Sequence, residues 1–178
     1  MATAIVYHSQ TGSCKRYAEL LSARLHLPCY ADGRAPVRPD TEVIYVGWTM
    51  AGKVAGLAKA RKRYRLAGVV QVGMSPVGPD SVEQGRSANR LPASIPFFVL
   101  QGGFHMRLLP GGMQLVMKPI CAKLLKDLSR AKAQRSLNPA EQALYTMVST
   151  GEGAPPSWDV SEITEHYLVP GGGLSQSK

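Results

Sequence analysis

The chain has 178 residues, 44% of them hydrophobic, and a net charge of +9 from 21 Lys and Arg against 12 Asp and Glu. This length predicts one domain with an ordinary hydrophobic core, and no apolar run approaches the roughly 18 residues of a membrane span. The positive charge indicates attraction to something anionic: a phosphate-bearing cofactor, an acidic substrate, a membrane surface or nucleic acid.

The cysteines indicate a reducing compartment. Cys14, Cys29 and Cys121 are odd in number and unpatterned in spacing, so they fit neither a disulfide framework nor a zinc site, and we expect no metal. The N-terminus enters an apolar run without a basic segment or a small-residue cleavage site, so we predict no signal peptide. The expected location is the cytoplasm.

Short apolar runs alternate with helical stretches over the first 103 residues. Alternation of this kind predicts parallel β-α-β units with right-handed crossovers. The near-continuous apolar character of four of the runs predicts a sheet that is covered on both faces. We expect strands at residues 4–9, 28–33, 42–47, 69–74 and 96–103, and helices at 13–27, 54–65 and 80–91.

The last third of the chain reads as helical. An apolar stripe predicts a long helix that Pro119 kinks, and Asn138 followed by Pro139 is a typical helix start. A final helix is expected over residues 160–168, with Asp159 or Ser161 at its cap. The stripe comprises Met113, Met117, Ile120, Leu124 and Leu128, which we interpret as core rather than as a quinone or porphyrin site.

These elements predict a single domain at residues 1–170. Its core would be the strand and helix region at residues 1–103, followed by a C-terminal helical part at residues 104–170. Residues 171–178, GGGLSQSK, read as a flexible tail.

Residues 9–14, SQTGSC, connect the first strand directly to a helix. The loop offers backbone N–H groups at a helix N-terminus, a glycine and three hydroxyls, which together suit a phosphate. An ordinary Ser/Thr-rich helix cap has the same composition. The position of residues 9–14 directly after the first strand favours a phosphate-binding loop, because ligands of open parallel sheets bind at the carboxyl ends of the strands.

Residues 47–54, GWTMAGKV, have the glycine and lysine spacing of a nucleotide-binding P-loop. Val54 stands where the loop needs a hydroxyl to hold Mg²⁺, no predicted strand ends in an acidic residue, and Trp48 is bulky where backbone must wrap phosphate. The dinucleotide pattern G-x-G-x-x-G is also missing after every predicted strand. An aromatic side chain at a strand end opposite a phosphate loop instead suits a flat ring with a phosphate tail.

The opening AIVYHSQTGSCKRYAELLSARL resembles that of the flavodoxin family, whose phosphate loop reads [ST]-x-T-G-x-[ST]. Cys14 departs from this pattern where the last Thr is expected. The resemblance implies FMN, with Trp48 as the residue that stacks on its ring. The implied cofactor-binding residues are Ser9, Gln10, Thr11, Gly12, Ser13 and Cys14 in the first loop, Gly47, Trp48, Thr49, Met50 and Ala51 in the second, and Met74, Ser75 and Pro76 in the third.

The resemblance also implies a flavodoxin-like three-layer α/β fold with a five-stranded parallel sheet of order 2-1-3-4-5, here with extra C-terminal helices. FFVLQGGFHMRL and MQLVMKPICAKLLK are similar to a branch that includes flavodoxin-type protoporphyrinogen dehydrogenases. Three functions stay open: electron transfer to a redox partner protein, an FMN oxidoreductase acting on a porphyrinogen or quinone, and an interaction module that has lost FMN.

The distribution of charged residues suggests what the protein could bind. None of the three loops contains a carboxylate, which predicts a less negative flavin potential than in an acidic electron shuttle. Residues 59–65, KARKRYR, and the group Lys118, Lys123, Lys126, Arg130 and Lys132 could meet an acidic substrate or an anionic membrane, or could simply form solvated helix faces. No nucleic-acid-binding motif appears.

Three further side chains could have a chemical role. His105 could act as an acid, a base or an anion contact, and Arg107 could pair with a carboxylate, although both also suit an ordinary surface loop. The thiol of Cys14, at a helix N-terminus, is expected to have a depressed pKa. No catalytic residue can be assigned from spacing.

Overall fold

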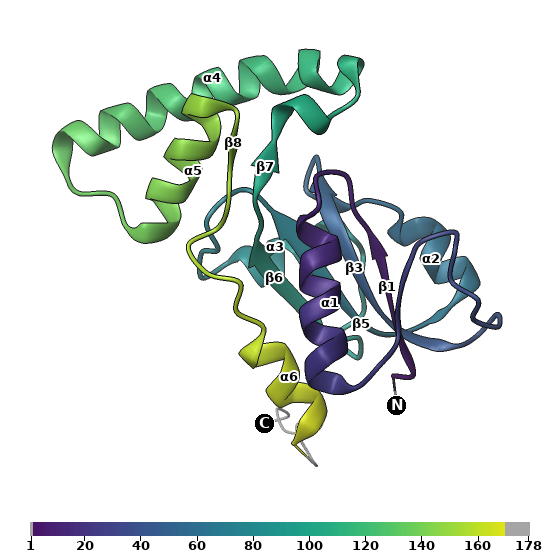
Figure 1. Ribbon diagram of the computed structural model, residues 1–178. Coiled ribbons are helices and arrows are strands. Elements are labelled where there is room, and N and C mark those ends of the chain that lie inside the picture. The colour runs from purple at the N-terminus through teal and green to yellow at the C-terminus, as the bar shows by residue number, and fades with distance from the viewer. Residues whose placement is uncertain (1, 170–178) are drawn as a thin grey trace.

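The structure is a computed structural model that describes residues 2–169, so the predicted tail at residues 171–178 lies outside the described residues. Its centre is a parallel sheet of order β2-β1-β3-β5-β6 (Figure 1). The predicted α/β class and the order 2-1-3-4-5 of a flavodoxin-like fold are confirmed, since β4 lies off this path. The strands are β1 (Ala4–His8), β2 (Cys29–Ala31), β3 (Glu42–Met50), β5 (Arg65–Gly73) and β6 (Phe97–Gln101).

Helices cover both faces of this sheet, as the apolar strands predict. Side chains alternate along β3, so that Ile44 and Val46 enter one core while Val43 and Tyr45 enter the other. Helices α1 (Ser13–Leu25) and α6 (Ser161–Leu168) cover the first core. Helices α2 (Leu57–Arg63) and α3 (Ser81–Ala88) lie on the other face.

Helix α6 belongs to this sandwich although it is the last element of the chain. It packs beside α1 (Figure 1), with Ile163 fully buried in the first core. The Tyr167 hydroxyl donates a hydrogen bond of 2.9 Å to the Ala67 carbonyl in β5, and Gly68 beside it leaves room that a Cβ would fill. The predicted final helix is therefore confirmed, and it completes the helix layer on that face.

The end of β3 differs from the prediction. The strand continues through Trp48 to Met50 and turns back antiparallel into β4 (Lys53–Val54), where a helix was expected from residue 54. Ala51 and Gly52 both have positive φ, 48° and 77°, which is the backbone of a tight two-residue hairpin turn. Residues 47–54 thus form a β-hairpin, and α2 begins only at Leu57, so no helix follows the turn as it would in a P-loop.

Between β6 and α6 the chain makes an excursion that we call the arm, residues 104–153 (Figure 1). It has its own apolar cluster, in which Met147 is fully buried and Phe104 and Leu144 nearly so. Its elements are β7 (Phe104–His105), the 3₁₀ turn η1 (Met106–Leu108), α4 (Gly111–Gln134), α5 (Pro139–Thr150) and β8 (Glu152–Gly153), with β7 and β8 paired antiparallel.

The predicted stripe on α4 is largely confirmed, since four of its members pack into the arm cluster. Ile120 does not, and stays 44% exposed. Cys121 takes its place, because the buried face turns with 3.6 residues per turn and passes one position further on. Helix α4 runs through Pro119 without ending there.

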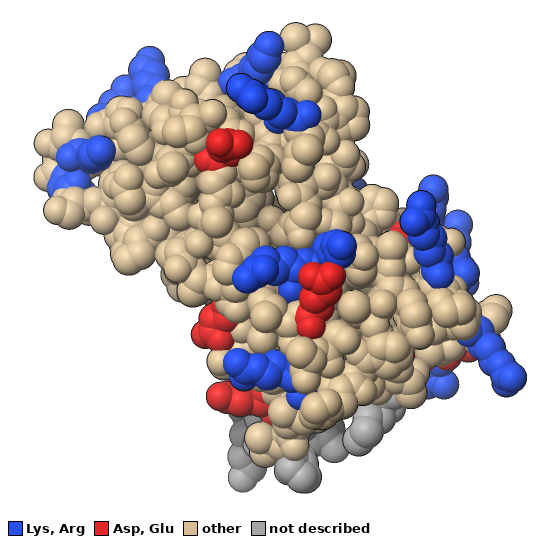
Figure 2. Space-filling model, viewed as in Figure 1, with Lys and Arg blue, Asp and Glu red and all other residues tan. Residues whose placement is uncertain are grey.

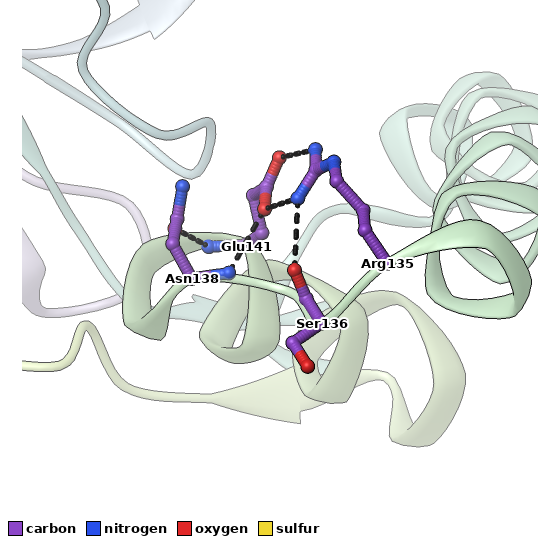
Figure 3. A network of polar contacts seen from close by, with 4 residues as sticks. All are labelled: Arg135, Ser136, Asn138 and Glu141. Atoms are coloured by element: carbon purple, nitrogen blue, oxygen red, sulfur yellow. Dashed lines mark hydrogen bonds and ion pairs between the residues drawn. The ribbon is translucent and has the colours of Figure 1, made fainter.

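A polar network fixes the turn between α4 and α5 (Figure 3). The Asn138 side chain accepts the Glu141 N–H, and the Glu141 carboxylate accepts the Asn138 N–H, which makes a complete capping box. Arg135 grips the same carboxylate with both terminal nitrogens at 2.6 and 2.7 Å. Arg135 holds the pKa of Glu141 down, at about 2, with help from the Asn138 N–H. The predicted helix start at Asn138 is confirmed.

Candidate functional site

The loops that follow β1 and β5 and the end of β3 meet at one edge of the sheet, where they enclose a cavity that is partly open to solvent. The cavity lies at the carboxyl ends of the parallel strands, as expected for this fold. Its lining comprises Ser9, Gln10, Thr11, Ser13, Cys14, Trp48, Thr49, Val72, Gly73, Met74, Gly102, Gly103, Phe104, Leu109, Met113 and Met117.

The backbone of the first loop turns at Gly12 into the N-terminus of α1. Gly12 has a φ of 97° and caps α1, and its N–H is donated to the Ser9 hydroxyl at 3.1 Å. The Arg16 N–H bonds back to the Gly12 carbonyl, so the N–H groups of the preceding first turn point out of the helix end. A Cβ on Gly12 would meet nothing within 4 Å, so the loop is open in front of this residue. These donors could hold a phosphate.

Ser13 has another partner. Its hydroxyl donates to the Gly103 carbonyl at 3.2 Å and accepts the Gly103 N–H at 2.9 Å. These bonds join the start of α1 to the start of the arm, so the Ser13 hydroxyl already has hydrogen-bond partners within the protein. Ser9 and Thr11 are half-buried at the cavity wall, and the Ser9 hydroxyl, which accepts the Gly12 N–H, keeps its own proton to donate.

The expectation of a depressed pKa for Cys14 is wrong. The residue is only 1% exposed, and burial raises the pKa of its thiol to about 12. The N–H groups of the helix end favour the thiolate, but they do not offset the loss of solvent around the sulfur. Cys14 is therefore a neutral wall of the cavity, not a reactive thiol.

Trp48 lies in β3, paired with Val72 of β5, and not in a loop as the sequence suggested. Its ring packs on the core that α1 covers and also lines the cavity. The indole Nε1 is a buried donor without a hydrogen-bond partner among the described residues. Such a donor is destabilising by about 1–3 kcal/mol unless it is satisfied, so it suits a ligand that brings an acceptor.

A groove continues the cavity towards α3. It shares Thr49, Gly73, Met74 and Met117 with the cavity, and it extends between α3 and α4. Among the predicted site residues, Ala51, Ser75 and Pro76 line this groove instead of the cavity. The third loop therefore meets the site from the side of α4.

Three predicted residues lie elsewhere. Gly12 faces a wider, more open space beside the α1 N-terminus. Gly47 is buried in β3, where a Cβ would clash with the Val54 side chain, so its absence of a side chain serves the hairpin. Met50 is 52% exposed and lines neither the cavity nor the groove.

Half of the residues that line the cavity were not predicted from the sequence. Phe104, Leu109, Met113 and Met117 come from the arm, which folds back over the sheet edge. The methionines also pack against the arm cluster, so the core interpretation was right in part. Gly102 gave a usable signal, since a glycine at a strand end indicates close approach, and a Cβ there would meet Val72 at 2.6 Å.

His105 and Arg107 lie outside the cavity lining. His105 faces the open space beside α1, with its Nδ1 3.4 Å from the Glu152 carboxylate across the β7–β8 pair. Arg107 is exposed on η1. Lys53 lines a separate depression beside α2 and does not reach the cavity.

Electrostatically the cavity favours an anion or a neutral ring. No Asp or Glu is among its lining residues, and the open space beside the first loop is lined by Arg16 and, on the side of the arm, by Glu152. Within the described residues, no group of three or more His, Cys, Asp or Glu could hold a metal ion. Helices of the described part are all too short or too polar to cross a membrane.

No protein-family model matches this sequence, and no curated protein matches it either.

Proposed function

We propose that this protein binds FMN and transfers electrons through it. One observation carries the proposal: a single cavity at the carboxyl edge of a flavodoxin-like sheet brings together the α1 N-terminal loop, Trp48 and Met74. A loop rich in N–H donors beside an aromatic, mostly apolar wall suits a flat ring with an anionic tail.

The residues have distinct tasks in this proposal. Backbone N–H groups of Thr11 and of residues 13–15, with the hydroxyls of Ser9 and Thr11, hold the phosphate. Trp48 packs against the ring, and its unpartnered Nε1 gains an acceptor. Cys14, Val72 and Met74 exclude water from the ring's surroundings. The bound FMN supplies the redox chemistry, while the protein sets its orientation and potential.

The test is the visible spectrum of the protein as purified, followed by titration of the cofactor-free protein with FMN. A flavin spectrum and saturable binding are expected. Riboflavin is the matched ligand, because it has the same ring and lacks the phosphate. Much weaker binding of riboflavin would support the phosphate loop, whereas a colourless protein that binds neither ligand would contradict the proposal and favour an interaction module without FMN.

A variant pair separates the loop from general stability. Gly12→Val places a β-branched residue at a φ of 97°, which disfavours the loop conformation. We expect this variant to lose most of its preference for FMN over riboflavin. Gly33→Val is the control, since Gly33 also has a positive φ, 80°, with open space around it, but lines neither cavity nor groove.

A second candidate is an FMN-dependent oxidoreductase of the protoporphyrinogen dehydrogenase or quinone reductase type. The groove favours it, because Ser75, Pro76 and Leu124 border a second space that adjoins the cavity and could seat a flat apolar substrate next to the cofactor. Turnover of a porphyrinogen or a quinone by the pure, FMN-loaded protein would support this candidate. Reduction of the cofactor only in the presence of a redox partner protein would favour electron transfer instead.

Two weaker expectations belong to the same proposal. The carboxylate-free lining supports a less negative flavin potential than that of an acidic shuttle, which a potentiometric titration measures. The three cysteines are all free, with Cys14 and Cys121 buried, which supports a reducing compartment such as the cytoplasm.

A further inference from the structure

Helix α4 presents an apolar outer surface. Its inner face packs in the arm cluster through Cys121 and its neighbours, but Leu115 is 72% and Val116 62% exposed. Leu108, in the η1 turn that precedes the helix, is 57% exposed. Figure 1 shows α4 along the outer edge of the arm, away from the sheet. These side chains are therefore uncovered at the periphery of the protein, and together they form what we call the α4 outer face.

The same face is basic over its second half. At 100° per residue, Lys123, Lys126 and Arg130 fall within the arc that Leu115 and Val116 define. All three are exposed, and Figure 2 shows basic side chains along the edge of the molecule that α4 forms. The single acidic residue of this helix, Asp127, is exposed and lies at the border of that arc, about 20° beyond Val116.

We propose that the α4 outer face docks on an anionic lipid surface. Leu115 and Val116 enter the boundary between headgroups and acyl chains, while Lys123, Lys126 and Arg130 contact lipid phosphates. A helix with apolar side chains at one level and Lys or Arg beside them is the kind that lies in the plane of a membrane interface. Each basic residue near an anionic membrane strengthens attraction severalfold.

A second copy of this chain is a poorer occupant. Pairing two α4 outer faces would bring three basic residues of each copy together, with only Asp127 at the border of each face to balance them. A few aliphatic side chains also form a small patch compared with the roughly 800 Å² that each partner of a stable complex buries. Charge complementarity therefore selects an anionic partner.

Docking by this face has a consequence that rests on the proposed function. Met113 and Met117, on the opposite side of the same helix, line the cavity, and Leu109 lines it just before the helix begins. A membrane under α4 then lies one helix diameter, about 10 Å, from the proposed cofactor site. The substrate class that fits this arrangement is an apolar electron carrier dissolved in the lipid.

The test is flotation of the full chain with phosphatidylcholine vesicles, with and without phosphatidylglycerol. Binding is expected only with the anionic vesicles. Leu115→Glu and Val116→Glu should each abolish flotation, and the double variant Lys123→Glu, Lys126→Glu should weaken binding by at least about tenfold. Val82→Glu is the matched control, because Val82 is also an exposed valine on a helix, 37% exposed on α3.

A second measurement follows insertion directly. Leu115→Trp should gain a blue-shifted emission on anionic vesicles that the unmodified chain does not show. The proposal is overturned if the chain fails to float with anionic vesicles, or if Val82→Glu reduces flotation as much as Val116→Glu does. It is also overturned if substitutions on the α4 outer face reduce binding to an acidic protein while leaving vesicle binding unchanged. Flotation of the cofactor-free chain should be unchanged, so membrane docking is tested independently of whether the protein binds FMN.

Discussion

The sheet core and the arm are built differently although one chain forms both. In the core, α1 buries five of its 13 residues, and both faces of β3 and β5 are covered. In the arm, the 24-residue α4 buries only Cys121 fully and otherwise rests on half-buried side chains. Segments with few buried apolar contacts open at lower free energy than the global unfolding transition. We therefore expect the core to set global stability and the arm to move more independently over the cavity it covers.

The largest expected effect comes from deleting a buried side chain in each region. Ile163→Ala, in the core that α6 completes, should lower the free energy of global unfolding by about 2–5 kcal/mol. Met147→Ala removes a side chain of equal burial from the arm cluster. Its cost should appear as faster amide hydrogen exchange in α4 and α5, with a smaller change in global unfolding. Equal global losses would show that the two regions unfold as one unit.

The next effect concerns the cavity between the regions. Trp48→Ala should weaken FMN binding about tenfold or more, because loss of an aromatic contact and its buried area removes more than about 1.4 kcal/mol. Lys53→Ala, four residues beyond the end of the cavity wall and outside its lining, should leave affinity unchanged. Isothermal titration checks both, and denaturation of each variant separates lost binding from lost folding. If Lys53 proved essential and Trp48 dispensable, the site would lie elsewhere.

A smaller effect is expected at the turn between α4 and α5. Asn138→Ala removes the side-chain half of the capping box, which stabilises a helix start by about 1 kcal/mol. If the arm opens separately, this loss should be visible in hydrogen exchange of α5 and almost absent from the core strands. Asn89→Ala, whose side chain accepts the Val54 N–H in the β-hairpin, should do the opposite.

The smallest effect is a pH dependence confined to the arm. Because Arg135 lowers the pKa of Glu141 from its usual 4.5 to about 2, the folded arm holds the carboxylate ionised. The resulting stabilisation is present above pH 4.5 and is lost as the pH falls towards 2. Hydrogen exchange of α5 between these values should show the change, and Glu141→Gln should remove it. An unchanged pH profile in that variant would assign the effect to other carboxylates.

The strand and helix pattern of the core could be predicted because its signals are local. Residues 43–46 are β-branched or aromatic, the stretch after Gly12 has helical periodicity, and Asn138-Pro139 is a typical helix start. The hairpin at residues 51–52 was missed, because Ala at a positive φ gives no signal in the sequence. Helix propensity of the following lysines and arginines then extended the predicted helix too far forward.

The candidate site divides in the same way. The sequence by itself determined the parallel sheet, the order in which its loops reach one edge, and the glycine and hydroxyls of residues 9–14, since all of these follow from local patterns and from the handedness of crossovers. Only the tertiary structure decided that Trp48 sits in a strand and that Cys14 is buried with a raised pKa. It also decided that Met113 and Met117 close the cavity. The physical reason is that burial and close approach arise from contacts between residues far apart in the chain, which no local pattern encodes.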